Sequence, residues 1–206
     1  MTLVDIVQSK NLQTDKGNPH SYLERYDRLF PKAFALNELS SNKLSNLSII
    51  EIGVFKGESI QLWNEYFTQS VIIGMDLPSS PHFTLYTKEE VTRNKAYVIT
   101  GNAYSTITKN KVYDVLSDNK HRSIDIFIDD GDHNIQSQVR AIQLYLPLLS
   151  TPGVFIIEDI QGDEYLEELI NEAELVTDLS PCIIFEVMDN KSSICPDDLA
   201  LIITRE

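Results

Sequence analysis

Two apolar segments in the second half of the sequence end in clusters of acidic residues. Residues 124–128 lead into Asp129-Asp130-Gly131-Asp132-His133, and residues 154–157 lead into Glu158-Asp159. Short runs rich in β-branched and aromatic residues are typical of buried strands, so each cluster is predicted at the carboxyl end of a strand. In open α/β sheets, ligands bind at that edge.

These acids predict a site for a hard metal ion. Carboxylates held close together repel one another unless a cation lies between them. Asp130, Glu158 and Asp159 offer only oxygen ligands, which suit Mg²⁺ or Ca²⁺, are compatible with Mn²⁺ and do not suit structural zinc. His133 follows closely along the chain and is the candidate general base. Helix capping or loop solvation is the alternative explanation for any one acid, and a structural role is the alternative for His133.

Composition restricts the class of partner. The 206 residues are near the upper end for one compact domain, and 42% of them are hydrophobic, enough for a sizeable core. Lys and Arg number 17 against 31 Asp and Glu, and the net charge of −14 argues against nucleic acid and anionic membranes as partners. The sequence shows no apolar run long enough to span a bilayer and no signal-peptide pattern. With Cys182 and Cys195 interpreted as reduced thiols, these features predict a cytoplasmic protein.

The chain divides into an N-terminal helical or lid segment, residues 1–45, and a domain over residues 46–206. The opening is polar to about Pro19, and apolar residues then recur at helical spacing from Ser21 to Leu36, with Pro31 as an interruption. Aromatic residues of this segment that look exposed in sequence are compatible with a homo-oligomer.

Strand and helix signals alternate through the second part. The expected strands are 48–53, 71–76, 96–100, 124–129, 153–158, 182–188 and 199–204. The expected helices lie near 57–67, 87–94, 104–119, 135–149 and 163–173. This alternation predicts an α/β fold with a mostly parallel sheet covered on both faces. The last two strands lack a long helix between them and predict an antiparallel hairpin, which completes the Rossmann-like, seven-stranded layout of class I methyltransferases.

The loop after the first predicted strand has the spacing of a cofactor loop. It reads Glu51-x-Gly53-x-x-x-Gly57-x-Ser59. Glycines let the backbone approach a ligand closely, and the following helix start offers free N–H groups. The third glycine of the dinucleotide fingerprint is missing, and the spacing looks instead like the loop of S-adenosylmethionine enzymes. An ordinary strand-to-helix turn is the alternative.

Polar residues also follow the second and third predicted strands. Asp76 ends the second strand and suits the two ribose hydroxyls of a nucleoside, although a nicotinamide cofactor would make the same demand. Asn102 follows the third strand and is the candidate for contacting an adenine edge, while a turn-forming Gly-Asn pair explains the same letters.

Several of these motifs occur together in the order known from one family. The order is Thr14-Asp15-Lys16-Gly17, His20-Ser21-Tyr22, Tyr26, Phe30, Glu51-Ile52-Gly53-Val54, Gly57-Glu58-Ser59, Leu62-Trp63, Gly74-Met75-Asp76, Asp129-Asp130-Gly131-x-His133 and Ile157-Glu158-Asp159. This resembles the metal-dependent sugar O-methyltransferases of macrolide biosynthesis, of the mycinamicin type, and is similar to the rhamnosyl O-methyltransferase and cephalosporin-hydroxylase group.

The resemblance implies a role for each matching residue. Mg²⁺ would be bound by Asp130, Glu158 and Asp159, with His133 as the general base, although periodicity leaves open whether Asp129 or Asp130 is the ligand. The residues implied for the S-adenosylmethionine pocket are Glu51, Gly53, Ser59 and Asp76, with Asp129 on the cofactor side or behind the ligands. Lys16, His20 and Tyr22 would form a lid. The sequence departs from the family at Asp132, where Ser is usual, and at Asn102, where a G-D-Q segment is usual.

The function predicted from the sequence is S-adenosylmethionine- and Mg²⁺-dependent methylation of a hydroxyl on a sugar or a glycosylated natural product. Three alternatives stay open at this level. The first is a metal-dependent catechol or phenol O-methyltransferase, the second a non-catalytic cofactor-binding protein, and the third a nicotinamide oxidoreductase. The incomplete glycine fingerprint and the acid clusters count against the last.

Overall fold

The computed structural model describes residues 1–206 except 18, 35–43, 79–94, 179, 181 and 192–197. The strands are β1 (Ser48–Ile52), β2 (Val71–Asp76), β3 (Lys95–Thr100), β4 (Ile124–Asp129), β5 (Leu149–Ile157), β6 (Ile183–Asp189) and β7 (Leu199–Arg205). The helices are α1 (Leu3–Lys10), α2 (Tyr22–Ala33), α3 (Glu58–Tyr66), α4 (Thr106–Asp118), α5 (Ile135–Tyr145) and α6 (Asp163–Val176), with a short 3₁₀ turn, η1 (Leu146–Leu148).

The seven strands form one sheet in the order β3-β2-β1-β4-β5-β7-β6. Strands β1 to β5 pair in parallel, whereas β7 runs antiparallel to both β5 and β6. The predicted Rossmann-like sheet with a reversed C-terminal hairpin is therefore confirmed. The order changes direction at β1, so the crevice beside β1 and β4 is the place where such sheets bind ligands.

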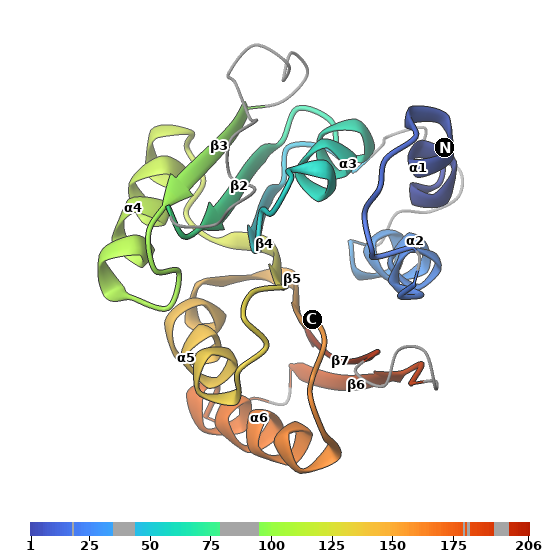
Figure 1. Ribbon diagram of the computed structural model, residues 1–206. Helices are drawn as coiled ribbons and strands as arrows, with labels where there is room; N and C mark the ends of the chain where they lie inside the picture. The colour runs from blue at the N-terminus through green and yellow to red at the C-terminus, as the bar shows by residue number, and fades with distance from the viewer. Residues whose placement is uncertain (18, 35–43, 79–94, 179, 181, 192–197) are drawn as a thin grey trace.

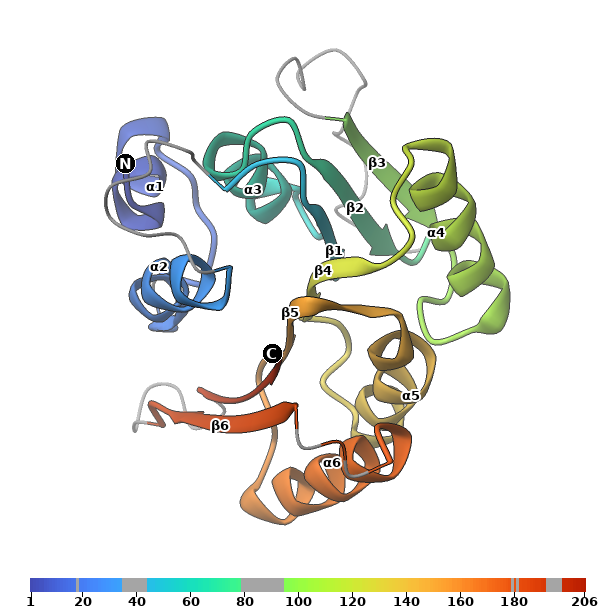
Figure 2. The same ribbon diagram turned by 180° about the vertical axis from the view of Figure 1, so that it is seen from behind.

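Alternate residues of the central strands face opposite layers of helices. Ile50 and Phe127 pack on the side of α4, α5 and α6, whereas Ile49 and Ile126 pack on the side of α1, α2 and α3. Figures 1 and 2 show these two layers on either side of the sheet. Both faces are apolar because a parallel sheet is covered on both sides.

The N-terminal segment packs against the sheet through aromatic side chains. Tyr22, Tyr26 and Phe30 of α2 are at most 1% exposed, and burying each contributes about 1.5–3 kcal/mol. The expectation that N-terminal aromatics are exposed was wrong for these three, because α2 turns them toward the sheet and Trp63. The prediction of a homo-oligomer was based on exposed aromatic residues in this segment, and these three residues no longer support it.

Helix α1 was not expected from the sequence. Thr2 and Asp5 form a reciprocal capping box at its start, a signal that is readable in the sequence but was outweighed by the polar composition. Helix α5 ends at Tyr145, four residues earlier than predicted, because Pro147 cannot continue a helix. The expected helix at 87–94 and Cys195 lie outside the described residues.

Hydrogen bonds just beyond the strands fix the loops at the carboxyl edge. Gly53 donates its N–H to the carbonyl of Met75, Asp130 donates to Ile52, and Glu158 donates to Asp129. Each bond extends the parallel ladder by about one residue. The residues that follow β1, β4 and β5 are thereby held side by side. No helix in the described part of the chain is long and apolar enough to cross a membrane.

Candidate functional site

The carboxyl edge of the sheet has two halves of different construction. The glycine half lies at the ends of β1, β2 and β3 and contains Gly53, Asp76, Gly101 and Asn102. The acid half lies at the ends of β4 and β5 and contains Asp130, His133, Glu158 and Asp159.

The halves meet where Gly53 passes the loop after β4. Gly53 has φ +92°, and a Cβ there would lie 1.9 Å from the carbonyl oxygen of Asp130. No side chain fits in that gap, so glycine is required for this close approach. The sequence motif at Gly53 thus has a direct structural reason.

A cavity of about 390 Å³ joins the two halves. Its lining includes Gly53, Ser59 and Asp76 from one half and Asp130 and His133 from the other. Its outer wall is formed by residues 13–15 of the N-terminal segment, where the Gln13 N–H donates to the Glu58 carboxylate. Groups from the predicted cofactor loop and from the predicted metal site therefore face one space.

A second cavity, of about 480 Å³, continues along the glycine half. Asp76, Gly101, Asn102, Tyr104 and Ser137 are among its lining residues, and it shares Gly53, Asp76 and Gly131 with the first cavity. The Asp76 carboxylate is held in place by the N–H groups of Phe55 and Leu77, at 2.9 and 2.7 Å. The predicted positions Asp76 and Asn102 thus lie together on one cavity wall.

Two predicted cofactor residues, Glu51 and Asp129, lie behind this lining. Glu51 is fully buried and accepts a 2.7 Å hydrogen bond from Ser59. Asp129 is 1% exposed and accepts a 2.9 Å bond from the Tyr104 hydroxyl. Burial raises the pKa of each of these carboxyls to about 7. Tyr104 was not predicted as a site residue, and no motif marks it.

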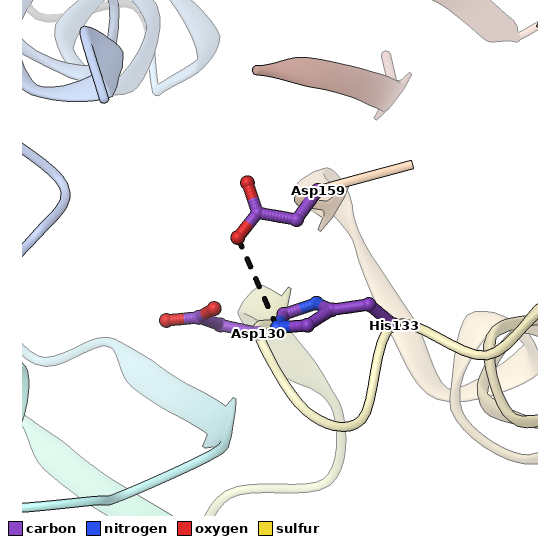
Figure 3. Close-up of side chains that lie close together, drawn as sticks. All are labelled: Asp130, His133 and Asp159. Carbon is purple, nitrogen blue, oxygen red and sulfur yellow. Dashed lines mark ion pairs between the residues drawn. The ribbon is translucent and has the colours of Figure 1, made fainter. Parts of the chain in front are cut away.

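The acid half brings Asp130, His133 and Asp159 together. One ligand atom from each lies within 4.8 Å of the others, and His133 Nε2 is 3.9 Å from Asp159 Oδ2. Figure 3 shows the three side chains, with a dashed line between His133 and Asp159. This group of close ligand atoms contains Asp130 and not Asp129. Periodicity alone had left open which of these two residues is the metal ligand. Its donor set of two carboxylates and one imidazole fits a divalent cation.

Three residues of the same loops have left-handed backbone conformations. His133 and Asp159 have φ values of +54° and +53°, and Phe55 in the loop after β1 has +47°. Non-glycine residues in this left-handed region each cost about 1–3 kcal/mol, and such strain gathers at functional sites. The side chains of these two residues, His133 and Asp159, face each other (Figure 3).

Glu158, the third predicted metal ligand, lies deeper than the other two acids. It is 1% exposed, and its Oε2 and Oε1 accept hydrogen bonds of 2.5 Å from Lys16 Nζ and from the Tyr26 hydroxyl. Glu158 is absent from the group of close ligand atoms formed by the described residues. Its pKa is raised because burial outweighs the effect of the Lys16 charge.

The N-terminal segment contributes further side chains to the acid half. The Tyr22 hydroxyl donates to Asp159 Oδ1 at 2.6 Å. The His20 ring stacks on Tyr22 with a centroid distance of 5.4 Å, and its Nδ1 is 3.6 Å from Asp159 Oδ1. The segment with Lys16, His20 and Tyr22, whose roles the sequence left undefined, therefore covers the acids.

The sheet order and the reversed hairpin define the fold of class I methyltransferases, and the solved structures similar to this chain share it. A family model described as a methyltransferase domain matches residues 50–160, more than half of the sequence. The chain belongs to this family.

Two curated relatives come from Streptomyces olivaceus. The 8-demethyl-8-alpha-L-rhamnosyl tetracenomycin-C 2'-O-methyltransferase is 23% identical over 155 residues, covering 72% of this chain and 35% of that protein. The 8-demethyl-8-(2-methoxy-alpha-L-rhamnosyl)-tetracenomycin-C 3'-O-methyltransferase is 26% identical over 104 residues, covering 50% and 23%. The chain thus spans about a third or less of the length of these relatives.

Two solved structures show the extent of the shared fold. The MycE methyltransferase of the mycinamycin biosynthetic pathway, in complex with Mg and SAH, superposes with a TM-score of 0.67 at 17% identity, covering 100% of this chain and 54% of that one. The O-methyltransferase from Bacillus cereus, in complex with SAH, gives 0.56 at 12% identity, covering 98% and 89%.

Proposed function

We propose that this chain is an S-adenosylmethionine- and divalent-metal-dependent O-methyltransferase that acts on a hydroxyl of a sugar or a glycosylated natural product. The observation that carries the proposal is the single cavity lined both by the glycine loop and by Asp130 and His133. Methyl transfer needs a donor and an acceptor oxygen in contact, and this cavity gives both one space.

The glycine half fits a methyl donor with a nucleoside part. Gly53 lines both cavities, and the fixed Asp76 carboxylate suits two ribose hydroxyls. Asn102 and Ser137 on the same wall suit an adenine edge. When bound, S-adenosylmethionine would supply a methyl group on a sulfonium, whose carbon–sulfur bond breaks as the acceptor oxygen attacks, so the glycine half needs to orient the donor toward the acceptor.

The acid half fits a divalent ion. Asp130 and Asp159 would hold it, and Glu158 is the third proposed ligand. A carboxylate has about four lone-pair sites, so the two hydrogen bonds of Glu158 leave capacity for an ion. When bound, the ion would lower the pKa of an acceptor hydroxyl.

His133 is the proposed general base. Its side chain is 31% exposed and lines the cavity, and its Nε2 lies 3.9 Å from Asp159 Oδ2. It would take the hydroxyl proton as the oxygen attacks the methyl carbon, a contribution of about 10²–10⁴-fold. Residues 13–15 and the aromatic residues of α2 would limit the access of water from the N-terminal side.

The relatives favour a sugar as the acceptor. Both curated relatives are named as methyltransferases of rhamnosyl groups, and MycE was also solved in complex with Mg, SAH and mycinamycin VI. A catechol is the second candidate acceptor, because the vicinal oxygens of a catechol and those of a sugar could each chelate a metal held by carboxylates.

Acceptor profiling tests the proposal. The protein is incubated with S-adenosylmethionine, Mg²⁺ and either a panel of rhamnosides and other glycosides or a panel of catechols. Mass spectrometry then detects products that have gained one methyl group. We expect methylated glycosides, and no product after chelation of the metal. Methylation confined to catechols would overturn the assignment of a sugar acceptor. Product formation that is unaffected by chelation would show that the reaction does not need the metal.

A further inference from the structure

Lys16 is an internal cation of the acid half. Its side chain is 1% exposed, and its Nζ lies 2.5 Å from Asp130 Oδ2, 2.5 Å from Glu158 Oε2 and 3.4 Å from Glu51 Oε1. These three carboxylates lie in or just after three different strands. The N-terminal segment thus inserts one positive charge among acids that lie 35 to 142 residues away along the chain.

The donors of Lys16 are matched by these acids. An ammonium group has three N–H donors and no acceptor. Two of them donate to Asp130 Oδ2 and Glu158 Oε2, and Glu51 Oε1 lies 3.4 Å away as an ion-pair partner. A buried charge is stable only when it is paired in this way. As an ammonium among three carboxylates, Lys16 has no lone pair to accept a proton, which excludes it as a catalytic base in this arrangement.

Two of its three partners are also the proposed ligands of the divalent ion. Asp130 contacts Lys16 through Oδ2 while it lies in the close group with His133 and Asp159. Glu158 contacts Lys16 through Oε2. The ammonium and a divalent ion would therefore draw on the negative charge of the same two carboxylates.

We propose that Lys16 is a positioning residue that acts as a permanent cation on Asp130 and Glu158 and so sets how tightly the divalent ion is held. The inference rests on the metal site of the proposed function. It assigns to the N-terminal segment a function beyond covering the site, because the segment then determines the charge that an entering ion meets.

The test compares Mn²⁺ affinity in three variants by calorimetry and by the electron paramagnetic resonance of free Mn²⁺. Lys16→Met keeps the length of the side chain and removes its charge, and it should bind Mn²⁺ at least about tenfold more tightly, since one repelling charge near the ion is gone. Glu51→Gln removes a carboxylate that is not a proposed ligand, and it should bind Mn²⁺ severalfold more weakly.

Lys10→Met is the matched control. Lys10 lies in the same N-terminal segment, is 44% exposed and pairs with Glu65 at 3.2 Å, away from the acids. Its loss should leave Mn²⁺ affinity unchanged. Damage to the fold would weaken binding in both test variants, whereas the proposed charge effect gives opposite signs.

The outcomes separate this inference from the proposed function. If the unmodified chain binds Mn²⁺ and a folded Lys16→Met variant binds it equally or more weakly, the inference is overturned. If Lys16→Met fails to fold, unchanged affinity in Glu51→Gln overturns it. If the unmodified chain binds no Mn²⁺ but Lys16→Met does, the inference about Lys16 stands, and the proposed function no longer includes a metal. Absence of binding in every variant overturns both.

Discussion

The glycine half of the sheet edge is lined by backbone and partly exposed side chains, whereas the acid half is closed by buried side chains from a distant segment. In the first, Gly53 and Asp76 are placed by local loop geometry and by hydrogen bonds between neighbouring strands. In the second, Glu158 is placed by Lys16 and Tyr26, which are 142 and 132 residues away in sequence. The comparison shows that a cavity wall can be encoded in local loops at neighbouring strand ends, while a buried charged cluster needs partners from elsewhere in the chain.

The largest expected effect concerns His133, which lies where the two halves meet. His133→Ala should lower turnover by about 10²–10⁴-fold on a glycoside that the unmodified chain methylates, because a positioned base is lost. Binding of S-adenosylhomocysteine and Mn²⁺ should be retained, as calorimetry can show. His121→Ala, in the turn before β4, is the control. A collapse of Mn²⁺ affinity would make His133 a metal ligand instead, and near-normal turnover would remove it from the mechanism.

The next effect is confined to the glycine half. Asp76→Ala should weaken S-adenosylhomocysteine binding at least about tenfold, since hydrogen bonds to a charged group contribute about 1.5–3 kcal/mol. Mn²⁺ affinity should stay the same. Asp114→Ala, at an exposed position of α4, is the control in the same titration and should bind S-adenosylhomocysteine like the unmodified chain. If S-adenosylhomocysteine bound Asp76→Ala as tightly as the unmodified chain, the ribose assignment would be wrong.

The sequence predicted the first half better than the second for a physical reason. A glycine loop and an acid at a strand end are local patterns, and the structure places Gly53, Ser59 and Asp76 on one cavity. The depth of Glu158 and the contacts of Lys16 depend on how α2 and its preceding segment pack on the sheet. No spacing rule within a strand or a loop contains that information.

The fold itself was predictable because strands and helices alternate with clear periodicity. Strands β2 and β4 have the predicted bounds, and the antiparallel position of β7 follows from the missing crossover helix. Helix α1 was missed because its eight residues are too few to give a clear periodic signal. The burial of the aromatic residues of α2 was also missed, since amphipathic spacing alone does not say which surface a helix covers.

Stability measurements test the tight packing of the acid half. Tyr26→Phe removes the donor to Glu158 Oε1 inside the core and should lower the free energy of unfolding by about 1–3 kcal/mol, the usual cost of leaving a buried acceptor unpaired. Denaturant titration measures this loss. Tyr113→Phe, at a position that is 52% exposed, should have no effect, and equal stability of both variants would contradict the closed construction.

A smaller loss is expected at the border of the glycine half. Tyr104→Phe removes the hydroxyl that donates to Asp129, and it should cost about 1 kcal/mol because the Tyr104 side chain is only partly buried. The same denaturant titration measures it beside Tyr26→Phe. A loss larger than that of Tyr26→Phe would reverse the expected order and place the more critical hydrogen bond on the glycine half.

The central claim is that the glycine half binds S-adenosylmethionine, and calorimetry tests it most directly. Purified protein is titrated with S-adenosylmethionine and separately with NAD, each with and without Mg²⁺. We expect micromolar binding of S-adenosylmethionine and none of NAD. Binding of NAD alone, or no binding of S-adenosylmethionine under any of these conditions, would contradict the account and leave an α/β domain whose chemistry is not methyl transfer.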